Sequence, residues 1–128
     1  MKNNMEPSLR LQKLAMSIME RLIDQHWRLV AIVINHGKII SIMPNLPLKS
    51  HPLVNSYNPK KKIHAEINTY LHASIEKMKG SILYVFRLCA NGKFGMAKPC
   101  EMCYNEAIKH GIKRIVFTTE NGFGVIKI

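Results

Sequence analysis

Two short motifs in the sequence carry residue types that bind metal ions. The first, at residues 64–66, reads His-Ala-Glu and supplies an imidazole and a carboxylate. The second, at residues 99–103, reads Pro-Cys-Glu-Met-Cys and supplies two thiols about one helical turn apart. Zinc prefers imidazole and thiolate ligands, and three protein ligands leave a fourth position for water. The sequence therefore predicts one zinc ion held by His64, Cys100 and Cys103.

The carboxylate of Glu66 would allow the predicted zinc site to catalyse a hydrolytic reaction. Bound zinc lowers the pKa of a water molecule toward 7, which generates a nucleophile at neutral pH. The partial positive charge of a helix N-terminus favours the thiolate form of Cys100 and Cys103. A carboxylate at the start of a helix, as predicted for Glu66, can take a proton from the water and pass it to a leaving nitrogen. The predicted reaction is hydrolytic deamination of a heterocyclic, amidine-like carbon.

The order of the two motifs is more specific than either motif alone. H-x-E followed by P-C-x-x-C is the signature of zinc deaminases. From about Leu29 to the C-terminus the sequence resembles the cytidine deaminase superfamily, which includes cytidine, deoxycytidylate, tRNA-adenosine and polynucleotide deaminases. The resemblance implies that His64, Cys100 and Cys103 bind zinc and that Glu66 is the proton shuttle.

Five further residues are candidates for contacts with a substrate. The resemblance implies that the Ala65 backbone contacts the base and that Asn45 contacts the ribose. Tyr57 and Phe94 lie in the loops before the two motifs, where an aromatic ring either stacks on a base or anchors its own loop. Lys98 directly precedes the second motif and is placed to attract a phosphate.

Hydrophobic periodicity and turn residues predict the elements that position these groups. Ser8 is the predicted N-cap of an amphipathic helix that runs to about Gln25, with Leu11, Leu14, Ala15, Ile18 and Leu22 on its buried stripe. The strands are predicted at 29–34, 38–43, 82–88, 112–118 and 125–128, and the remaining helices at 64–79 and 100–110. An Asn-His-Gly turn at 35–37 joins the first two strands as a hairpin.

The resemblance implies an α/β fold of the cytidine deaminase type, in which a mixed five-stranded sheet lies between two layers of helices. Right-handed crossovers put the helices at 64–79 and 100–110 on one face of the sheet, with their N-termini near the same edge. Residues 119–124 are too few to hold a helix, so the last strand is predicted to be antiparallel to the fourth.

A chain of 128 residues is typical of one domain. We expect a single deaminase domain over residues 1–128, with an N-terminal helix in 1–27 and the zinc-binding core in 28–128. No leader and no run of about 20 apolar residues is present, which predicts a soluble, cytoplasmic protein without a membrane partner. Three cysteines, two of them in C-x-x-C, favour thiols kept reduced for a metal. Cys89 is expected to be a structural thiol in the core.

The net charge is +11, from 19 Lys and Arg against 8 Asp and Glu. Such a charge favours a phosphate-bearing or polyanionic partner, although a basic surface that only keeps the protein soluble is an equal alternative. Lys109, Lys113 and Arg114 are predicted to lie at the far end of the third helix, away from the zinc site.

Several substrates and two other kinds of function stay open on sequence alone. The first hypothesis is deamination of cytosine in a nucleoside or nucleotide such as cytidine or dCMP, and the second is the same reaction on single-stranded DNA or RNA. Adenosine of a tRNA is a third substrate. A structural zinc module closed by His51, His72 or His110, or a redox dithiol, would leave Glu66 without a role. The compact form resembles small bacteriophage-encoded deaminases, which act in the host cytoplasm. The resemblance to the family also implies a homo-oligomer.

Overall fold

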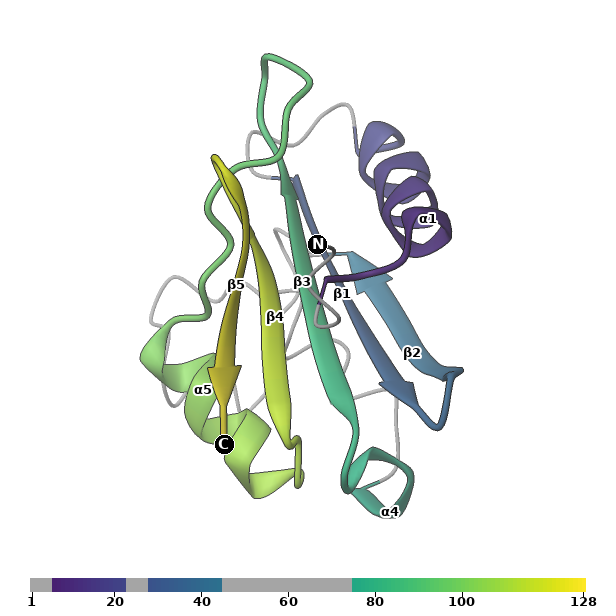
Figure 1. Ribbon diagram of the computed structural model, residues 1–128, viewed down its shortest axis with the longest axis vertical. Coiled ribbons are helices and arrows are strands. Elements are labelled where there is room, and N and C mark those ends of the chain that lie inside the picture. Colours follow the sequence, from purple (N-terminus) through teal and green to yellow (C-terminus); the bar gives the residue numbers. More distant parts are fainter. Residues whose placement is uncertain (1–5, 23–27, 45–74) are drawn as a thin grey trace.

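The computed structural model of the protein describes residues 6–22, 28–44 and 75–128. In chain order the elements are α1 (Leu9–Glu20), β1 (Arg28–Asn35), β2 (Lys38–Pro44), α4 (Ile75–Met78), β3 (Ile82–Leu88), α5 (Glu101–Lys109), β4 (Arg114–Thr119) and β5 (Gly122–Lys127). This order agrees with the predicted one (Figure 1). The start of the helix predicted at 64–79 lies outside the described residues, and α4 is its described end.

The five strands form one mixed sheet in the order β2-β1-β3-β4-β5. β3 and β4 are parallel, and the other neighbouring strands are antiparallel. The antiparallel return of β5 confirms the prediction, because only a tight turn separates it from β4. β5 begins at Gly122 rather than at Val125, since Gly122 and Gly124 lack the side chains by which a strand is read from sequence. The ring of Phe117 occupies the space that a side chain on Gly124 would need.

Helices cover both faces of the sheet, as predicted. Along β1, Val30 and Ile32 belong to the core cluster that packs against α1, and Ala31 and Val33 belong to the cluster that packs against α4 and α5. All four side chains are 0% exposed, which explains why β1 reads as a continuous apolar run. The shared cluster of α4 and α5 confirms that the second and third helices lie on one face.

Helix α1 begins as predicted and ends earlier than predicted. The Ser8 side chain accepts a hydrogen bond from the Leu11 amide at 3.2 Å and so caps the helix. The buried stripe is Leu11, Ala15 and Met19, whereas Leu14 is 39% exposed, so the predicted stripe was wrong at that position. The helix ends at Glu20 instead of about Gln25, because the next two amides bond back only three residues, to the carbonyls of residues 18 and 19.

The β1–β2 hairpin turns as predicted, with positive φ angles of 51° at His36 and 75° at Gly37. The Asn35 side-chain amide donates to the carbonyls of Lys77 and Lys79, at 3.0 and 3.3 Å. These bonds hold the hairpin against the end of α4, at the edge of the sheet where β3 and β4 begin. Among the described helices, none is long and apolar enough to cross a membrane.

Candidate active site

The P-C-x-x-C motif lies where α5 begins. Cys100 is the N-cap of α5, with an extended backbone (φ −72°, ψ 170°), and its carbonyl accepts the first helical hydrogen bond, from the Tyr104 amide at 2.9 Å. The helix therefore starts one residue later than predicted, at Glu101. β3 and β4 are parallel and α5 is the crossover between them, so both strands end at the edge of the sheet from which the chain enters α5 (Figure 1). We call this the carboxyl edge.

The two thiols differ in burial. Cys103 is 0% exposed and belongs to the core cluster between α5 and the sheet, whereas Cys100 is exposed. Neither thiol is in a disulfide. Thiols three residues apart at the positive end of a helix suit zinc, and an ion bound by both would lie at the boundary between core and solvent. The donor set of α5 thus fits two of the three predicted zinc ligands.

The remaining predicted residues are divided between described and undescribed parts of the chain. Outside the described residues lie Asn45, Tyr57, His64, Ala65 and Glu66. Among the residues that the structure describes, no group of three or more His, Cys, Asp or Glu could hold a metal ion. The described end of β2, at Pro44, pairs with Val30 and so reaches the carboxyl edge directly before Asn45.

A short segment between β3 and α5 is inserted between the ends of two strands. The pairing of β3 with β4 ends at Val85 and Phe117. Beyond that point the Gly95 amide donates at 3.0 Å to the carbonyl of Arg87, the last residue but one of β3. On the other side the Ala97 amide donates to the Thr118 carbonyl, at 2.9 Å. Both strands therefore hold the segment that leads into the P-C-x-x-C motif.

The hydroxyl of Thr118 joins these three chain segments. It donates to the Gly95 carbonyl at 2.6 Å and accepts from the Arg87 amide at 3.1 Å, and the side chain is 0% exposed. The segment also passes so close to Cys89 that a side-chain carbon on Gly95 would overlap the Cys89 sulfur. Cys89 is half-buried rather than fully buried and packs against the backbone of this segment. Thr118 thus fixes the approach to α5 and the position of Cys100.

Replacing Thr118 by valine is expected to lower the free energy of unfolding by roughly 2–6 kcal/mol. Valine keeps the shape of threonine but leaves a backbone carbonyl and an amide without their partner, at a cost of about 1–3 kcal/mol each. Urea denaturation measures the loss. Thr118→Ser retains the hydroxyl and is expected to lie within about 1 kcal/mol of the wild type. Equal losses in the two variants would show that the hydroxyl is unimportant.

Phe94 lies on the face of the sheet opposite to α5. Its ring centroid is 5.8 Å from that of Phe86 and 6.4 Å from that of Phe123, and Phe86 itself belongs to the core cluster of α1. Cys103 belongs to the other cluster. This placement favours the alternative in which Phe94 anchors its loop over the one in which it stacks on a base.

Replacing Phe94 by alanine is therefore expected to destabilise the fold by about 2–3 kcal/mol, because a half-buried ring and two aromatic contacts are lost. We expect KM for any turned-over nucleotide to change less than about twofold. Thermal unfolding and steady-state kinetics on the same preparation test both parts. A large rise in KM with unchanged stability would restore the stacking role.

Cations gather at the carboxyl edge. Lys98 is exposed two residues before Cys100. The Arg28 guanidinium donates to the Cys89 carbonyl at 3.1 Å, and the Arg87 guanidinium donates to the Met96 carbonyl at 3.4 Å.

The roles of Thr118, Arg28 and Arg87 were not predicted from the sequence. Their only sequence signal is that each is a polar residue at the end of an apolar strand, and the contacts that give them a role join segments far apart in the chain.

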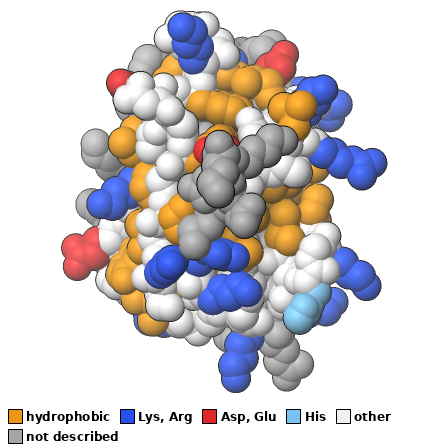
Figure 2. Space-filling model, in the orientation of Figure 1, with side chains coloured by type: hydrophobic (Ala, Val, Ile, Leu, Met, Phe, Trp, Pro, Cys, Tyr) orange, Lys and Arg blue, Asp and Glu red, His pale blue; other side chains and the backbone are white. Residues whose placement is uncertain are grey.

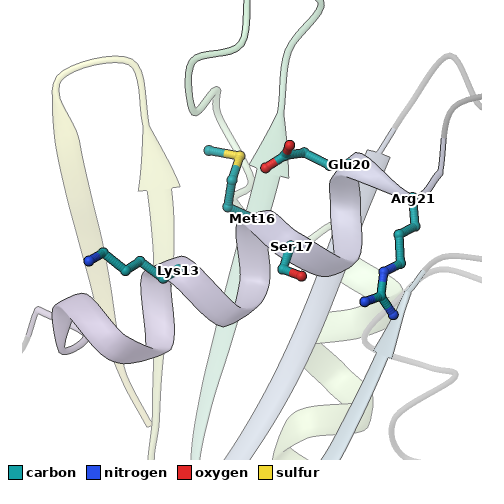
Figure 3. A pocket seen from close by; sticks show the side chains of 5 residues that line it. All are labelled: Lys13, Met16, Ser17, Glu20 and Arg21. Atoms are coloured by element: carbon teal, nitrogen blue, oxygen red, sulfur yellow. The ribbon is translucent and has the colours of Figure 1, made fainter.

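A depression in the surface of about 450 Å³ lies over α1 and not at the carboxyl edge. The lining residues come from one side of that helix: Lys13, Met16, Ser17, Glu20 and Arg21 (Figure 3). Because α1 and α5 pack on opposite faces of the sheet, this depression is separate from the cysteines.

Three solved structures agree with the fold. The crystal structure of dCMP deaminase from the cyanophage S-TIM5 in apo form superposes with a TM-score of 0.57 at 19% identity, covering 88% of this chain and 86% of that one. The same enzyme in complex with dCMP and dUMP gives a TM-score of 0.54 at 19% identity, covering 88% and 83%. RibD of Acinetobacter baumannii, form 2, gives 0.56 at 15% identity, covering 86% of this chain and 27% of that one.

Sequence comparison assigns the family. A search of curated proteins gave no match. In contrast, the family model described as the cytidine and deoxycytidylate deaminase zinc-binding region matches residues 5–119, which include both motifs and most of the chain. The fold, the P-C-x-x-C motif at the start of α5 and this match agree with one another. The chain therefore belongs to the cytidine and deoxycytidylate deaminase family and is an enzyme of that type.

Proposed function

We propose that this enzyme is zinc-dependent and deaminates cytosine to uracil in a free nucleoside or nucleotide such as cytidine or dCMP. The observation that carries the proposal is the pair Cys100 and Cys103 at the N-terminus of α5, one exposed and one buried, behind a segment held between β3 and β4. The structural relative solved with dCMP and dUMP supports a nucleotide as substrate. The proposed zinc-binding core is residues 28–128.

In this proposal His64 is the third ligand beside Cys100 and Cys103. A helix that starts at His64 and ends in α4 would be about 20 Å long, since each residue adds about 1.5 Å. α4 ends at the edge opposite to the carboxyl edge, so the start of such a helix would lie beside the start of α5. When bound, zinc supplies the Lewis acidity that lowers the pKa of a water to about 7.

Glu66 moves the protons in the proposed reaction. Its carboxylate accepts a proton from the attacking water, whose oxygen bonds to C4 of cytosine, and delivers it to the ring nitrogen N3. A second proton passes from the new C4 hydroxyl through the same carboxylate to the exocyclic amino group; the C4–N bond then breaks, which leaves the C4 carbonyl of uracil and releases ammonia. The Ala65 backbone and Asn45 orient base and sugar, and Lys98 attracts the phosphate of a nucleotide.

The substrate is tested by measuring ammonia release from a panel that contains cytidine, deoxycytidine, CMP, dCMP, adenosine, and cytosine-containing single-stranded DNA and RNA. We expect turnover of a free cytosine nucleoside or nucleotide by the zinc-loaded protein. Turnover of only the polynucleotides would favour the alternative that the net charge of +11 supports. A protein that holds one zinc ion and turns over none of these substrates would contradict the proposal.

A further inference from the structure

The edge of the sheet opposite to the carboxyl edge collects positive charge from five separate segments. Its cationic residues come from the β1–β2 hairpin, the end of α4, the end of α5, the start of β4 and the end of β5. They are Lys38, Lys77, Lys79, Lys109, Lys113, Arg114 and Lys127, which together we call the basic edge. All are exposed except Arg114, which is half-buried.

Backbone contacts between these segments place the cations along one edge. Lys127 pairs with Arg114 across the β4–β5 ladder, and Arg114 pairs with Ile82 at the start of β3. The Lys113 amide donates at 2.9 Å to the carbonyl of Ser81, which lies two residues after Lys79. The bonds from Asn35 to the carbonyls of residues 77 and 79 bring in the hairpin that carries Lys38. Figure 1 shows the hairpin tip, α4, the end of α5 and the C-terminus at the bottom of the molecule.

The acidic side chains that the structure describes are fewer at this edge than the cations. Of the five acidic side chains in the described part of the chain, Glu106 lies near the basic edge, is 3% exposed and pairs with Lys109 at 3.4 Å. Glu101 begins α5 and Glu120 lies in the β4–β5 turn, both away from the basic edge. Figure 2 shows Lys and Arg side chains, and no Asp or Glu, at the lower end of the face it presents. Among the described side chains, the basic edge therefore holds seven cations and one carboxylate.

The basic edge is a row of charges rather than a pocket. Four strand spacings of about 4.8 Å separate β2 from β5, so the row extends about 19 Å. A single phosphate would contact only a few of these cations. A nucleic acid strand carries one charge per about 3.4 Å along its axis, so it offers five or six phosphates over that length. The C-terminal ends of α4 and α5 lie at the same edge, where their carbonyls stabilise the lysines.

We propose that the basic edge binds the phosphate backbone of a nucleic acid, at a surface separate from the active site. β4 spans both edges, and its six residues put them about 16 Å apart. A strand bound along the basic edge therefore does not present its bases to the P-C-x-x-C motif. Binding would hold the enzyme on a nucleic acid while free nucleotides reach the carboxyl edge. This inference does not depend on the proposed substrate, because it concerns binding at another edge.

The described side chains favour nucleic acid backbone over base recognition. None of the large, exposed apolar side chains among them is aromatic, so the described part of the basic edge offers no exposed Phe, Tyr or Trp ring on which a base would stack. Three apolar side chains near the edge, those of Ile39, Ile108 and Ile128, are each 45–47% exposed. An anionic membrane surface, which also attracts lysines, is therefore the alternative that the experiment must separate.

The test compares two triple variants of the zinc-loaded protein that lose the same charge. The first is Lys79→Gln, Lys113→Gln and Lys127→Gln, all at the basic edge. The matched control is Arg10→Gln, Lys13→Gln and Arg21→Gln, all exposed on α1 (Figure 3 shows two of them). Fluorescence anisotropy with a labelled dT strand of 20 nucleotides and a 20-base-pair duplex gives the affinity between 50 and 200 mM salt.

We expect the wild type to bind both probes with a steep salt dependence. The basic-edge variant is expected to bind at least about tenfold more weakly at 50 mM salt, and its slope of log K against log salt should fall by about 2 for the strand and about 3 for the duplex. The α1 variant should stay within about twofold, and neither variant should change nucleotide turnover.

Three results would overturn the proposal. The first is a wild type that binds neither probe at 50 mM salt. The second is an equal loss of affinity in both triple variants, which would show an effect of net charge alone. The third is binding to vesicles of phosphatidylcholine and phosphatidylserine without binding to the oligonucleotides, which would assign the edge to a membrane surface.

Discussion

Replacing Glu66 by glutamine is expected to lower kcat on a cytosine nucleotide by about 10²–10⁴-fold, because glutamine cannot accept and return a proton. The amide has nearly the same size as the carboxylate, so zinc content and the free energy of unfolding should stay close to those of the wild type. Steady-state kinetics with dCMP, together with the zinc content of the same preparation, makes the measurement.

A matched control removes the same charge elsewhere on the protein. Glu120 is an exposed carboxylate in the turn after β4, and we expect Glu120→Gln to keep full activity. If Glu66→Gln turned over substrate as fast as Glu120→Gln, Glu66 would not be the proton shuttle. The zinc site and the assignment to the family would be untouched by that result.

Replacing Cys103 by alanine is expected to remove both the zinc ion and the activity. Cys103 is 0% exposed in the core cluster beneath α5, so the variant loses little packing volume but one of three proposed ligands. Loss of a supporting hydrogen bond already lowers metal affinity by about 10–100-fold, and loss of a ligand should exceed that range. Zinc content after gel filtration and thermal unfolding with and without a chelator provide the measurement.

Cys89 offers the matched control for this variant. It is a half-buried thiol that precedes the motif in the sequence. It packs against Gly95 and does not lie at the start of α5. We expect Cys89→Ala to retain one zinc ion and to deaminate at the rate of the wild type. A Cys103→Ala protein that kept its zinc would show that Cys103 is a packing residue of the core.

Local chemistry made part of the fold predictable from sequence. The hairpin was predicted from the Asn-His-Gly turn at 35–37, in which His36 and Gly37 take the positive φ angles, and β3 was predicted to the residue because Gly80 bounds a short apolar run. The P-C-x-x-C motif was correctly placed at a helix start, since proline and cysteine there fix the backbone.

The features that the sequence could not predict depend on tertiary contacts. Leu14 and Met19 are equally apolar, and only the packing of α1 on the sheet decides that Met19 is buried. The role of Thr118 rests on hydrogen bonds to residues 23 and 31 positions away, which no local pattern indicates. The position of Phe94 is set by rings on β3 and β5, and the sequence alone left its role open.

The dependence of deamination on zinc tests the central claim most directly. The purified protein is freed of metal with a chelator, and turnover of a cytosine nucleotide is measured before and after zinc is added back. We predict that activity disappears with the metal and returns in full at one zinc ion per chain. Turnover that persists in the metal-free protein would contradict the proposed zinc-dependent mechanism.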